Sequence, residues 1–266
     1  MKLKLLASAL LLTIAGCSSS STGRQQITLF SPDQLNKMGA QSFEELKSKE
    51  KISTNKSAIS FVNCIANNIT RNVPKGVHKG DWEVVVFESD QVNAFALPGG
   101  KIGVYTGLIK VTENQHQLAA VMGHEVAHVI EQHSNERLSA SSLAQTGMQI
   151  GAAVLATTEL ENKELWMAGL GLGVQFGVIM PYGRTHEKEA DIVGQELMAK
   201  SGFKPKASVD LWYNMAKQSK GAPPEFMSTH PSHETRIKKL SNHLKVSEPM
   251  FKASKQKPNC FKPKSI

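Results

Sequence analysis

The sequence lacks any apolar run of about 20 residues, the length that a helix needs to cross a bilayer. Its two most apolar segments, residues 5–15 and 166–180, are shorter, and the second contains Gln175. This excludes a membrane-spanning helix of ordinary length within the sequence as it stands. We expect residues 166–180, with their glycines at four-residue spacing, to pack in the core or to cover a site as a flap.

Cysteine is also scarce, with three residues in 266. Cys17 follows the small residues Ala15 and Gly16, after a short positive start and an apolar run, and this resembles the lipobox of bacterial lipoproteins. An ordinary signal peptide that happens to contain Cys17 is the alternative. We therefore expect residues 1–16 to be a signal peptide and residues 17–30 a flexible tether that is lipid-anchored through Cys17.

The other two cysteines, Cys64 and Cys260, are an even pair in a chain expected to be exported. Export places them in an oxidising compartment, which favours a disulfide between them. Two buried free thiols are the alternative. Ser18, rather than aspartate, follows Cys17, and by resemblance to enterobacterial sorting this favours the periplasmic face of the outer membrane.

Acidic residues are fewer than basic ones, 23 against 31, and the formal net charge is +8. Much of the excess lies in a tail over residues 247–266, which carries Lys252, Lys255, Lys257, Lys262 and Lys264. We expect this tail to be solvated, which would allow it to lie near anionic surfaces, and export argues against a nucleic-acid partner. Residues 31–246 are then expected to form the functional domain.

Helical periodicity and turn signals predict an α+β fold that is predominantly α-helical, with a small sheet packed beside the central helix. Thr112, with Gln115 three residues on, predicts a capping box at the start of that helix. The expected helices cover residues 32–49, 59–69, 112–133, 185–201, 207–219 and 232–244, and the expected strands cover 82–87, 92–97 and 101–105. Residues 139–180 are expected to form two further helices joined by a charged turn at residues 159–164, the second of them rich in glycine.

The central helix contains His124-Glu125-Val126-Ala127-His128. Two histidines four residues apart lie one turn apart on one helix face, so both imidazoles can bind one metal ion. Glu125 between them can accept the proton of an attacking water. The surrounding residues 121–130 carry no other charge, as a buried metal helix requires. Two helix histidines that make ordinary hydrogen bonds are the alternative.

A catalytic zinc needs a third protein ligand, and one common solution is absent. The glycine and histidine that some zinc peptidases carry after this motif are replaced by Glu131 and Ser134. A glutamate on a later helix is the other solution, and Glu187 provides it, with Asp191 one turn further on to accept a hydrogen bond from a ligand histidine. The neighbouring His186 and Glu189 are not expected to be ligands.

These motifs resemble those of the M48 family of zinc metallopeptidases, in particular small periplasmic lipoprotein members near its Oma1-like branch. The resemblance rests on residues 124–128 and 184–194, and also on residues 93–100 and 229–231 with Arg236. It covers about residues 33–245 and implies a zincin-like domain with one zinc per chain. It implies that His124, His128 and Glu187 bind zinc, that Glu125 is the general base and that Asp191 supports a ligand.

The resemblance also implies roles for His230 and Arg236. His230 would stabilise the oxyanion or act as a fourth ligand that closes the site, whereas a loop histidine without function is the alternative. Arg236 would contact substrate or the oxyanion, or pair with a surface acid. A peptide substrate is expected to add as a strand beside residues 92–97, with binding residues Asn93, Ala94, Phe95 and Ala96.

The expected function is endopeptidase activity on envelope proteins, with misfolded polypeptides as substrates and protein quality control as the role. A different class of function stays open, in which the chain is a latent chaperone or scaffold whose zinc site His230 keeps closed. A purely structural zinc is disfavoured because Glu125 would then have no purpose beside the ligands.

Overall fold

The computed structural model describes residues 17–158, 162–164, 167–169, 180–218, 226, 230 and 234–266. Contacts divide the chain into two compact units, one of residues 1–31 with 131–186 and one of residues 32–130 with 187–266. The expected signal peptide lies outside the described residues, and so does most of the expected glycine-rich helix over residues 166–180.

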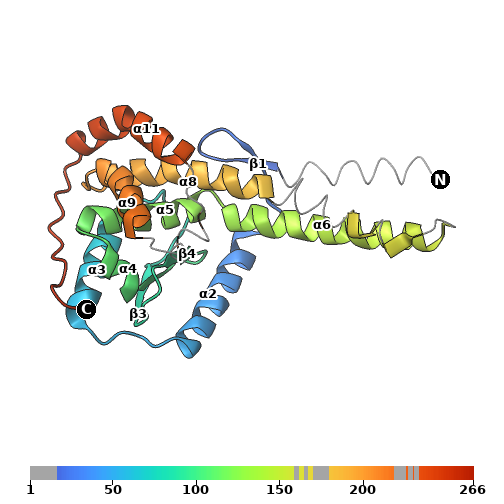
Figure 1. Ribbon diagram of the computed structural model, residues 1–266, viewed down its shortest axis with the longest axis horizontal. Coiled ribbons are helices and arrows are strands. Elements are labelled where there is room, and N and C mark those ends of the chain that lie inside the picture. The colour runs from blue at the N-terminus through green and yellow to red at the C-terminus, as the bar shows by residue number, and fades with distance from the viewer. Residues whose placement is uncertain are drawn as a thin grey trace. The chain divides into compact units, whose positions relative to one another are not determined.

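The second unit contains a three-stranded sheet in the order β3-β5-β4. Figure 1 labels β3 and β4 of this sheet. β5 (Lys101–Tyr105) lies in the middle, parallel to β3 (Glu83–Phe87) and antiparallel to β4 (Ala94–Leu97). β4 is therefore an edge strand of this sheet. Its alanines Ala94 and Ala96 are buried, and β4 packs against helix α5 (Gln115–Ile130).

Two helices precede the sheet, and the short helix α4 (Thr106–Val111) follows β5. α2 (Pro32–Lys49) contacts β4 and β5, and α3 (Lys56–Thr70) contacts β3 and α5. Asn55 caps α3 by accepting hydrogen bonds from the backbone N–H groups of Ser57 and Ala58. The apolar face of α3 is fully buried and joins α5 in the main core.

Helix α5 begins at Gln115, and its N-terminal cap differs from the predicted one. The side chain of Asn114 accepts hydrogen bonds from the backbone N–H groups of His116 and Gln117. Thr112 instead donates its hydroxyl to the carbonyl of Ile109 in the preceding helix. Asn114 is the better cap because its side-chain oxygen reaches the second and third N–H groups of the helix.

Three helices complete this part of the chain: α8 (Met180–Lys200), α9 (Lys206–Gln218) and α11 (Glu234–Ala253). α9 packs against α5 and α11. α11 extends to Ala253 with Pro249 inside it, so the first residues of the predicted solvated tail are helical. No helix within the described ranges is both long and apolar enough to cross a membrane.

The C-terminal tail is attached to the core rather than free. Cys64 and Cys260 form a disulfide, as predicted, with their Cα atoms 5.7 Å apart. The backbone N–H of Cys260 also donates to the side chain of Gln115, the first residue of α5. Lys262 donates to the backbone carbonyls of Lys110 and Thr112. The tail therefore holds α3 and the start of α5 together.

In the first unit, residues expected to be a flexible tether form a hairpin. β1 (Cys17–Ser19) pairs antiparallel with β2 (Gln25–Ile27), and the hairpin contacts the start of helix α6 (His133–Ala156). Arg24 donates two hydrogen bonds to the carboxylate of Glu136, at 2.7 and 2.5 Å. The composition of residues 17–30 predicts flexibility. The segment is ordered instead by bonds to a residue more than 100 positions further along the chain, which its composition does not reveal.

Candidate metal centre

Helix α5 places His124, Glu125 and His128 inside the second unit, each at most 6% exposed. The four-residue spacing brings the two rings together, and their Nε2 atoms are 3.1 Å apart. Each Nε2 also faces the carboxylate of Glu187, at 3.3 Å from His124 and 3.5 Å from His128. The predicted His-Glu-x-x-His motif is therefore assembled with its predicted third ligand.

Close packing of two helices brings Glu187 to the histidines. α8 crosses α5 at Gly194 and Gly123, where a Cβ atom added to Gly123 would lie 2.8 Å from the carbonyl oxygen of Gly194. A Cβ on Gly194 would likewise lie 2.8 Å from the Cα of His124. Only glycine at both positions permits this approach. The two helix backbones are thereby close enough for side chains of α8 to reach His124.

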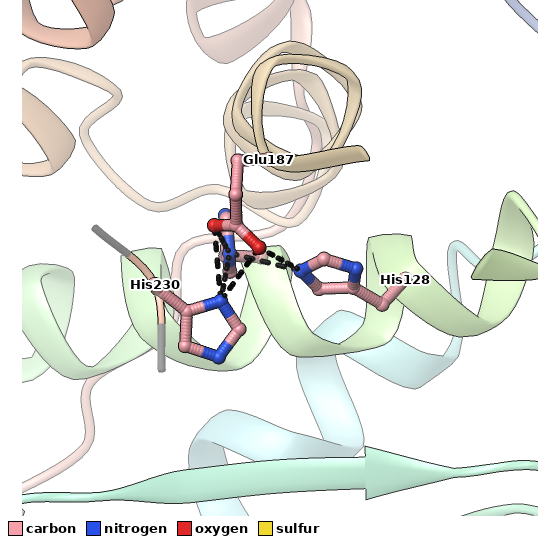
Figure 2. Close-up of side chains that lie close together, drawn as sticks. His128, Glu187 and His230 are labelled. Atoms are coloured by element: carbon pink, nitrogen blue, oxygen red, sulfur yellow. Dashed lines mark hydrogen bonds and ion pairs between the residues drawn. The ribbon is translucent and has the colours of Figure 1, made fainter. Parts of the chain in front are cut away.

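His230 lies over the same group of side chains. Its Nδ1 is 3.2 Å from Nε2 of His124 and 3.0 Å from both carboxylate oxygens of Glu187. Figure 2 shows the rings of His128 and His230 directed at the carboxylate of Glu187, which projects from α8. One potential ligand atom from each of these four side chains lies within 4.8 Å of the other three.

The spacing of these atoms fits a tetrahedral zinc ion. Ligand atoms about 2.0–2.1 Å from a tetrahedral zinc lie about 3.3 Å from one another. The ligand-to-ligand distances given above run from 3.0 to 3.5 Å. Two imidazoles and a carboxylate are also the donor set of many catalytic zinc sites. His124, His128 and Glu187 could therefore hold the metal, and His230 lies where a fourth ligand would bind.

Asp191 and Arg236 support the ligands from behind. Oδ1 of Asp191 lies 3.2 Å from Nδ1 of His124, on the side of the ring opposite the metal-facing nitrogen. The guanidinium of Arg236 donates two hydrogen bonds of 2.7 Å to Asp191. The carboxylate thus fixes the orientation of the His124 ring, and the guanidinium fixes the carboxylate.

Arg236 is buried beside the metal ligands, although contact with the substrate was one of the roles expected for it. It is 2% exposed, stacks on Trp212 with 4.4 Å from the guanidinium carbon to the ring centre, and lies 3.1 Å from Glu187. It also donates to the backbone carbonyl of His230 at 3.1 Å. These contacts are those of a residue that positions ligands, and they leave the guanidinium buried rather than facing a substrate.

Charges in the site are arranged for a cation. Burial penalises the charged form of His124, but hydrogen bonds with Asp191 and Glu187 outweigh that penalty and raise its pKa to about 9. Burial also opposes ionisation of the two carboxyls, yet His124 and His230 lower the pKa of Glu187, and Arg236 and His124 lower that of Asp191. Both carboxylates therefore remain ionised, and metal uptake by His124 releases a proton.

Glu125 has the environment of a general base. Burial raises the pKa of its carboxyl, while the nearby His230 and His124 oppose this shift. Its Oε1 is buried, accepts no hydrogen bond from the described residues and lies 3.4 Å from Nε2 of His230. A carboxylate with a raised pKa is a stronger base, which suits removal of a proton from a water molecule.

A second group of potential ligands lies in the first unit, where His133, Glu136 and His186 are each at most 1% exposed. The rings of His133 and His186 are stacked, with centroids 4.2 Å apart and planes 16° apart. The in-plane lone pairs of stacked imidazoles lie in nearly parallel, separated planes, which is unfavourable for both rings to bind one ion. Glu136 is also engaged by Arg24 and by His186, at 2.9 Å from the latter. We therefore assign this group to structure, and His186 is not among the described residues whose ligand atoms gather with that of His124.

The residues expected to bind substrate lie on or next to β4. The side chain of Asn93 accepts a hydrogen bond from the backbone N–H of Ala94. The ring of Phe95 packs against Phe43 and Phe87 in a separate aromatic cluster. Among these residues, the backbone of the edge strand is thus better placed than the side chains of Asn93 and Phe95 to meet a peptide.

Sequence reasoning did not identify three residues that the structure brings to this region. Gly123 and Gly194 set the distance between α5 and α8, whereas the glycine spacing noticed in the sequence lies at residues 169–177. Phe226 packs against the rings of His124 and His230, at 6.0 and 4.8 Å between centroids. Phe226 lies four residues before His230 in the sequence, and no motif marks it.

Comparisons with known proteins agree with the geometry. A family profile described as Peptidase family M48 matches residues 61–244. Mitochondrial metalloendopeptidase OMA1 of Schizosaccharomyces pombe is 32% identical over 182 residues, which are 68% of this chain and 50% of that protein. Metalloendopeptidase OMA1 of Bos taurus is 36% identical over 174 residues, 62% of this chain and 33% of that protein. Beta-barrel assembly-enhancing protease of Yersinia pestis is 28% identical over 202 residues, 74% of this chain and 41% of that protein. The chain matches half or less of the length of each of these relatives.

Proposed function

The chain belongs to peptidase family M48, and from this premise we propose that it is a zinc-dependent endopeptidase. The observation that carries the proposal is the set of ligand atoms of His124, His128 and Glu187 at tetrahedral spacing beside the buried Glu125. The relatives named as metalloendopeptidases support the same activity.

Each residue of the site would have a separate role in peptide hydrolysis. Bound zinc supplies Lewis acidity, which makes a water acidic near neutral pH and polarises a peptide carbonyl. Glu125 would accept the proton of the attacking water and donate it to the amine that leaves. Asp191 would hold the ring of His124 in the orientation and tautomer that bind the metal. The products are two peptides, and no covalent bond to the protein forms.

We propose that the substrate peptide adds to the edge of β4. The backbone N–H of Tyr105 donates to the carbonyl of Asn93, so the polar groups of Asn93 face β5. Because successive backbone groups of a strand alternate in direction, those of Val92, Ala94 and Ala96 face away from β5. An extended peptide can pair with these groups without contribution from its side chains, which suits unfolded substrates of varied sequence.

The lipobox-like sequence before Cys17 suggests an address in the bacterial cell envelope, with attachment to the periplasmic face of the outer membrane. The name Beta-barrel assembly-enhancing protease belongs to a relative, and it suggests outer-membrane proteins as the substrate class. We propose that the chain cleaves misfolded proteins of the bacterial cell envelope. Palmitate incorporation that requires Cys17, together with fractionation of the cell envelope, tests this address.

A resting state closed by His230 is the second candidate, and one observation favours it. Nδ1 of His230 lies 3.0–3.2 Å from two of the ligand side chains, the distance expected for a fourth ligand. A substrate carbonyl needs that position. The chain would then be a latent enzyme, or a chaperone or scaffold whose zinc site remains closed.

Cleavage of unfolded outer-membrane protein by three zinc-loaded forms separates these functions. For the peptidase we expect wild type to cleave, Glu125→Gln to be at least about a thousandfold slower, and His230→Ala to be faster than wild type if the closed state dominates. Equal rates for wild type and Glu125→Gln would exclude the peptidase. If neither wild type nor His230→Ala cleaves while both bind the unfolded protein, the chaperone is the better assignment.

A further inference from the structure

Helix α6 carries a row of large apolar side chains on its surface. Leu143, Ile150 and Val154 are 49%, 61% and 57% exposed. Their spacing of seven and four residues places all three on one face of the helix, where they form an apolar stripe. Single exposed apolar residues are ordinary, but an aligned row about 16 Å long marks a surface that meets an apolar partner.

The same length of α6 carries no charge. From Leu138 to Thr158 the sequence has no aspartate, glutamate, lysine or arginine. The helix face opposite the stripe presents the exposed side chains of Gln145 and Gln149. Charged side chains are the costly groups to bring next to hydrocarbon, and none has to be brought there. A helix of this kind can lie in the interfacial layer of a bilayer through its apolar side chains, without attraction to anionic lipid.

The hairpin β1–β2 is fastened to the face of α6 that carries the stripe. Ser139 accepts a hydrogen bond from the backbone N–H of Leu29 at 2.8 Å, and Ser139 lies one turn before Leu143 on that face. At the start of the hairpin, Cys17 pairs with Ile27 across the two strands. Ile27 and Leu29 are themselves exposed. A short ordered hairpin therefore joins the proposed lipid attachment point to this face of α6, within one compact unit.

We propose that the apolar stripe of α6 lies against the lipid bilayer to which Cys17 is attached. The proposal rests on the proposed lipid attachment and adds a second, non-covalent contact. An acyl anchor alone holds a protein at a membrane but leaves its orientation free, whereas a second contact along α6 fixes the orientation of the first unit. A bilayer is favoured over a protein partner because the anchor keeps this face beside lipid at high effective concentration.

Quenching of a fluorescent label by lipid tests the contact on the full lipidated chain in vesicles of phosphatidylethanolamine and phosphatidylglycerol. Acylation blocks Cys17, and the disulfide blocks Cys64 and Cys260. One added cysteine is then the only thiol that a bimane label can modify. The quencher is a nitroxide on the acyl chain of a tracer lipid, so it reports contact with the hydrocarbon and not mere proximity to the membrane.

The label positions compare two faces of the same helix. The variants Ile150→Cys and Val154→Cys place the label on the stripe, and Gln145→Cys and Gln149→Cys place it on the opposite face. We expect quenching to be about threefold or more stronger on the stripe, because only that face enters the hydrocarbon boundary. Quenching that is equal on the two faces, or absent from both, overturns the proposal.

Added charge tests whether the apolar side chains make the contact. With the label at Leu143→Cys, the pair Ile150→Asp and Val154→Asp should lower quenching to the level of the opposite face, since two carboxylates oppose entry into hydrocarbon. The matched pair Gln145→Asp and Gln149→Asp adds the same charge and should leave quenching as it is. If circular dichroism shows that the first pair does not fold, serine replaces aspartate in both pairs under the same criteria.

Salt separates this contact from one made by basic residues. The quenching should persist in 0.5 M salt, which screens exposed charges within a few ångströms, and loss of quenching there overturns the proposal. Labels on the stripe that are shielded from aqueous iodide but not quenched by lipid would show that a protein, or a second copy of the chain, covers the stripe instead.

Failure of the lipid attachment is distinguishable from failure of this proposal. If mass spectrometry finds no acyl group on Cys17, the proposed attachment has failed. The chain from residue 17 with Cys17→Ser, labelled at the same positions, is then mixed with an excess of vesicles. Selective quenching of the stripe in that form still supports its contact with lipid, and its absence overturns that contact.

Discussion

Arg236 joins three parts of the metal centre through one buried guanidinium. It pairs with both oxygens of Asp191, contacts Glu187, and donates to the carbonyl of His230. Lysine at this position keeps the positive charge but offers no planar fork, so it satisfies only part of this arrangement. We expect Arg236→Lys to weaken zinc binding by about tenfold to a hundredfold, measured by competition with a chelator.

A direct role of Arg236 in substrate binding predicts a different result. In that case Arg236→Lys would raise KM and leave zinc affinity as it is in wild type. Arg184→Lys is the matched control, because Arg184 lies on helix α8, as Glu187 does, but is exposed to solvent. We expect this control to change neither quantity.

At the scale of elements, the crossing of α5 and α8 depends on two glycines. A methyl group on Gly194 would lie 2.8 Å from the backbone of His124, so the helices would have to separate. We expect Gly194→Ala to lower the free energy of unfolding by about 1–3 kcal/mol and to weaken zinc binding, because Glu187 moves with α8. Chemical denaturation and chelator competition measure these two effects.

Gly183 is the matched control in the same helix, since an added Cβ there meets no atom within 4 Å. Alanine favours helix over glycine by up to about 1 kcal/mol. Gly183→Ala is therefore expected to leave stability unchanged or to raise it slightly, with the same zinc affinity as wild type. Loss of zinc affinity in both variants alike would show that helix composition, not the crossing, is responsible.

The hairpin β1–β2 is fastened to α6 by an ion pair that makes stability depend on pH. Burial would raise the pKa of Glu136, but hydrogen bonds from Arg24 and His186 lower it to about 2. A lowered pKa contributes stability that is present above about pH 4.5 and is lost as the pH falls towards 2. We expect Glu136→Gln to remove this part of the acid destabilisation, measured by urea unfolding of the zinc-free protein from pH 6 to 2.5.

At neutral pH the same variant is expected to be less stable by about 1–3 kcal/mol, because a buried partner of Arg24 is lost. Glu45→Gln is the control, since Glu45 pairs with Lys49 on the surface of α2. Exposed pairs contribute little, and its pH profile should match that of wild type. If the free energy of unfolding depends on pH in the same way for Glu136→Gln and wild type, the assignment of this pH dependence to Glu136 is contradicted.

The sequence permitted prediction of the parts of the site that depend on local spacing. His124 and His128, and likewise Glu187 and Asp191, are four residues apart within helices, so each pair must share a face. The contacts of Arg236 and Phe226 depend on how distant elements pack, and no local pattern encodes them. The hairpin was missed for the same reason, because the acids that order it, Glu131 and Glu136, lie far along the chain.

The whole molecule carries one covalent link between its early and late segments. Cys64 on α3 and Cys260 in the tail are separated by 196 residues. The sequence predicted this pairing only from the even number of remaining cysteines in a chain expected to be exported. The structure confirms the disulfide. A bond across so long a loop restricts the unfolded chain strongly, and the chain-entropy relation gives an upper contribution of about 5 kcal/mol.

We expect the double variant Cys64→Ala with Cys260→Ala to lose about 2–5 kcal/mol of stability and to melt roughly 5–15 °C lower than wild type. Reduction of the wild-type protein should give the same shift, whereas a reductant should leave the double variant unchanged, which serves as the control. The tail also bonds to Gln115, the first residue of α5, so amide exchange at the start of α5 should quicken once the link is absent. A melting temperature that is unaffected by reduction would show that the hydrogen bonds of the tail suffice to hold it.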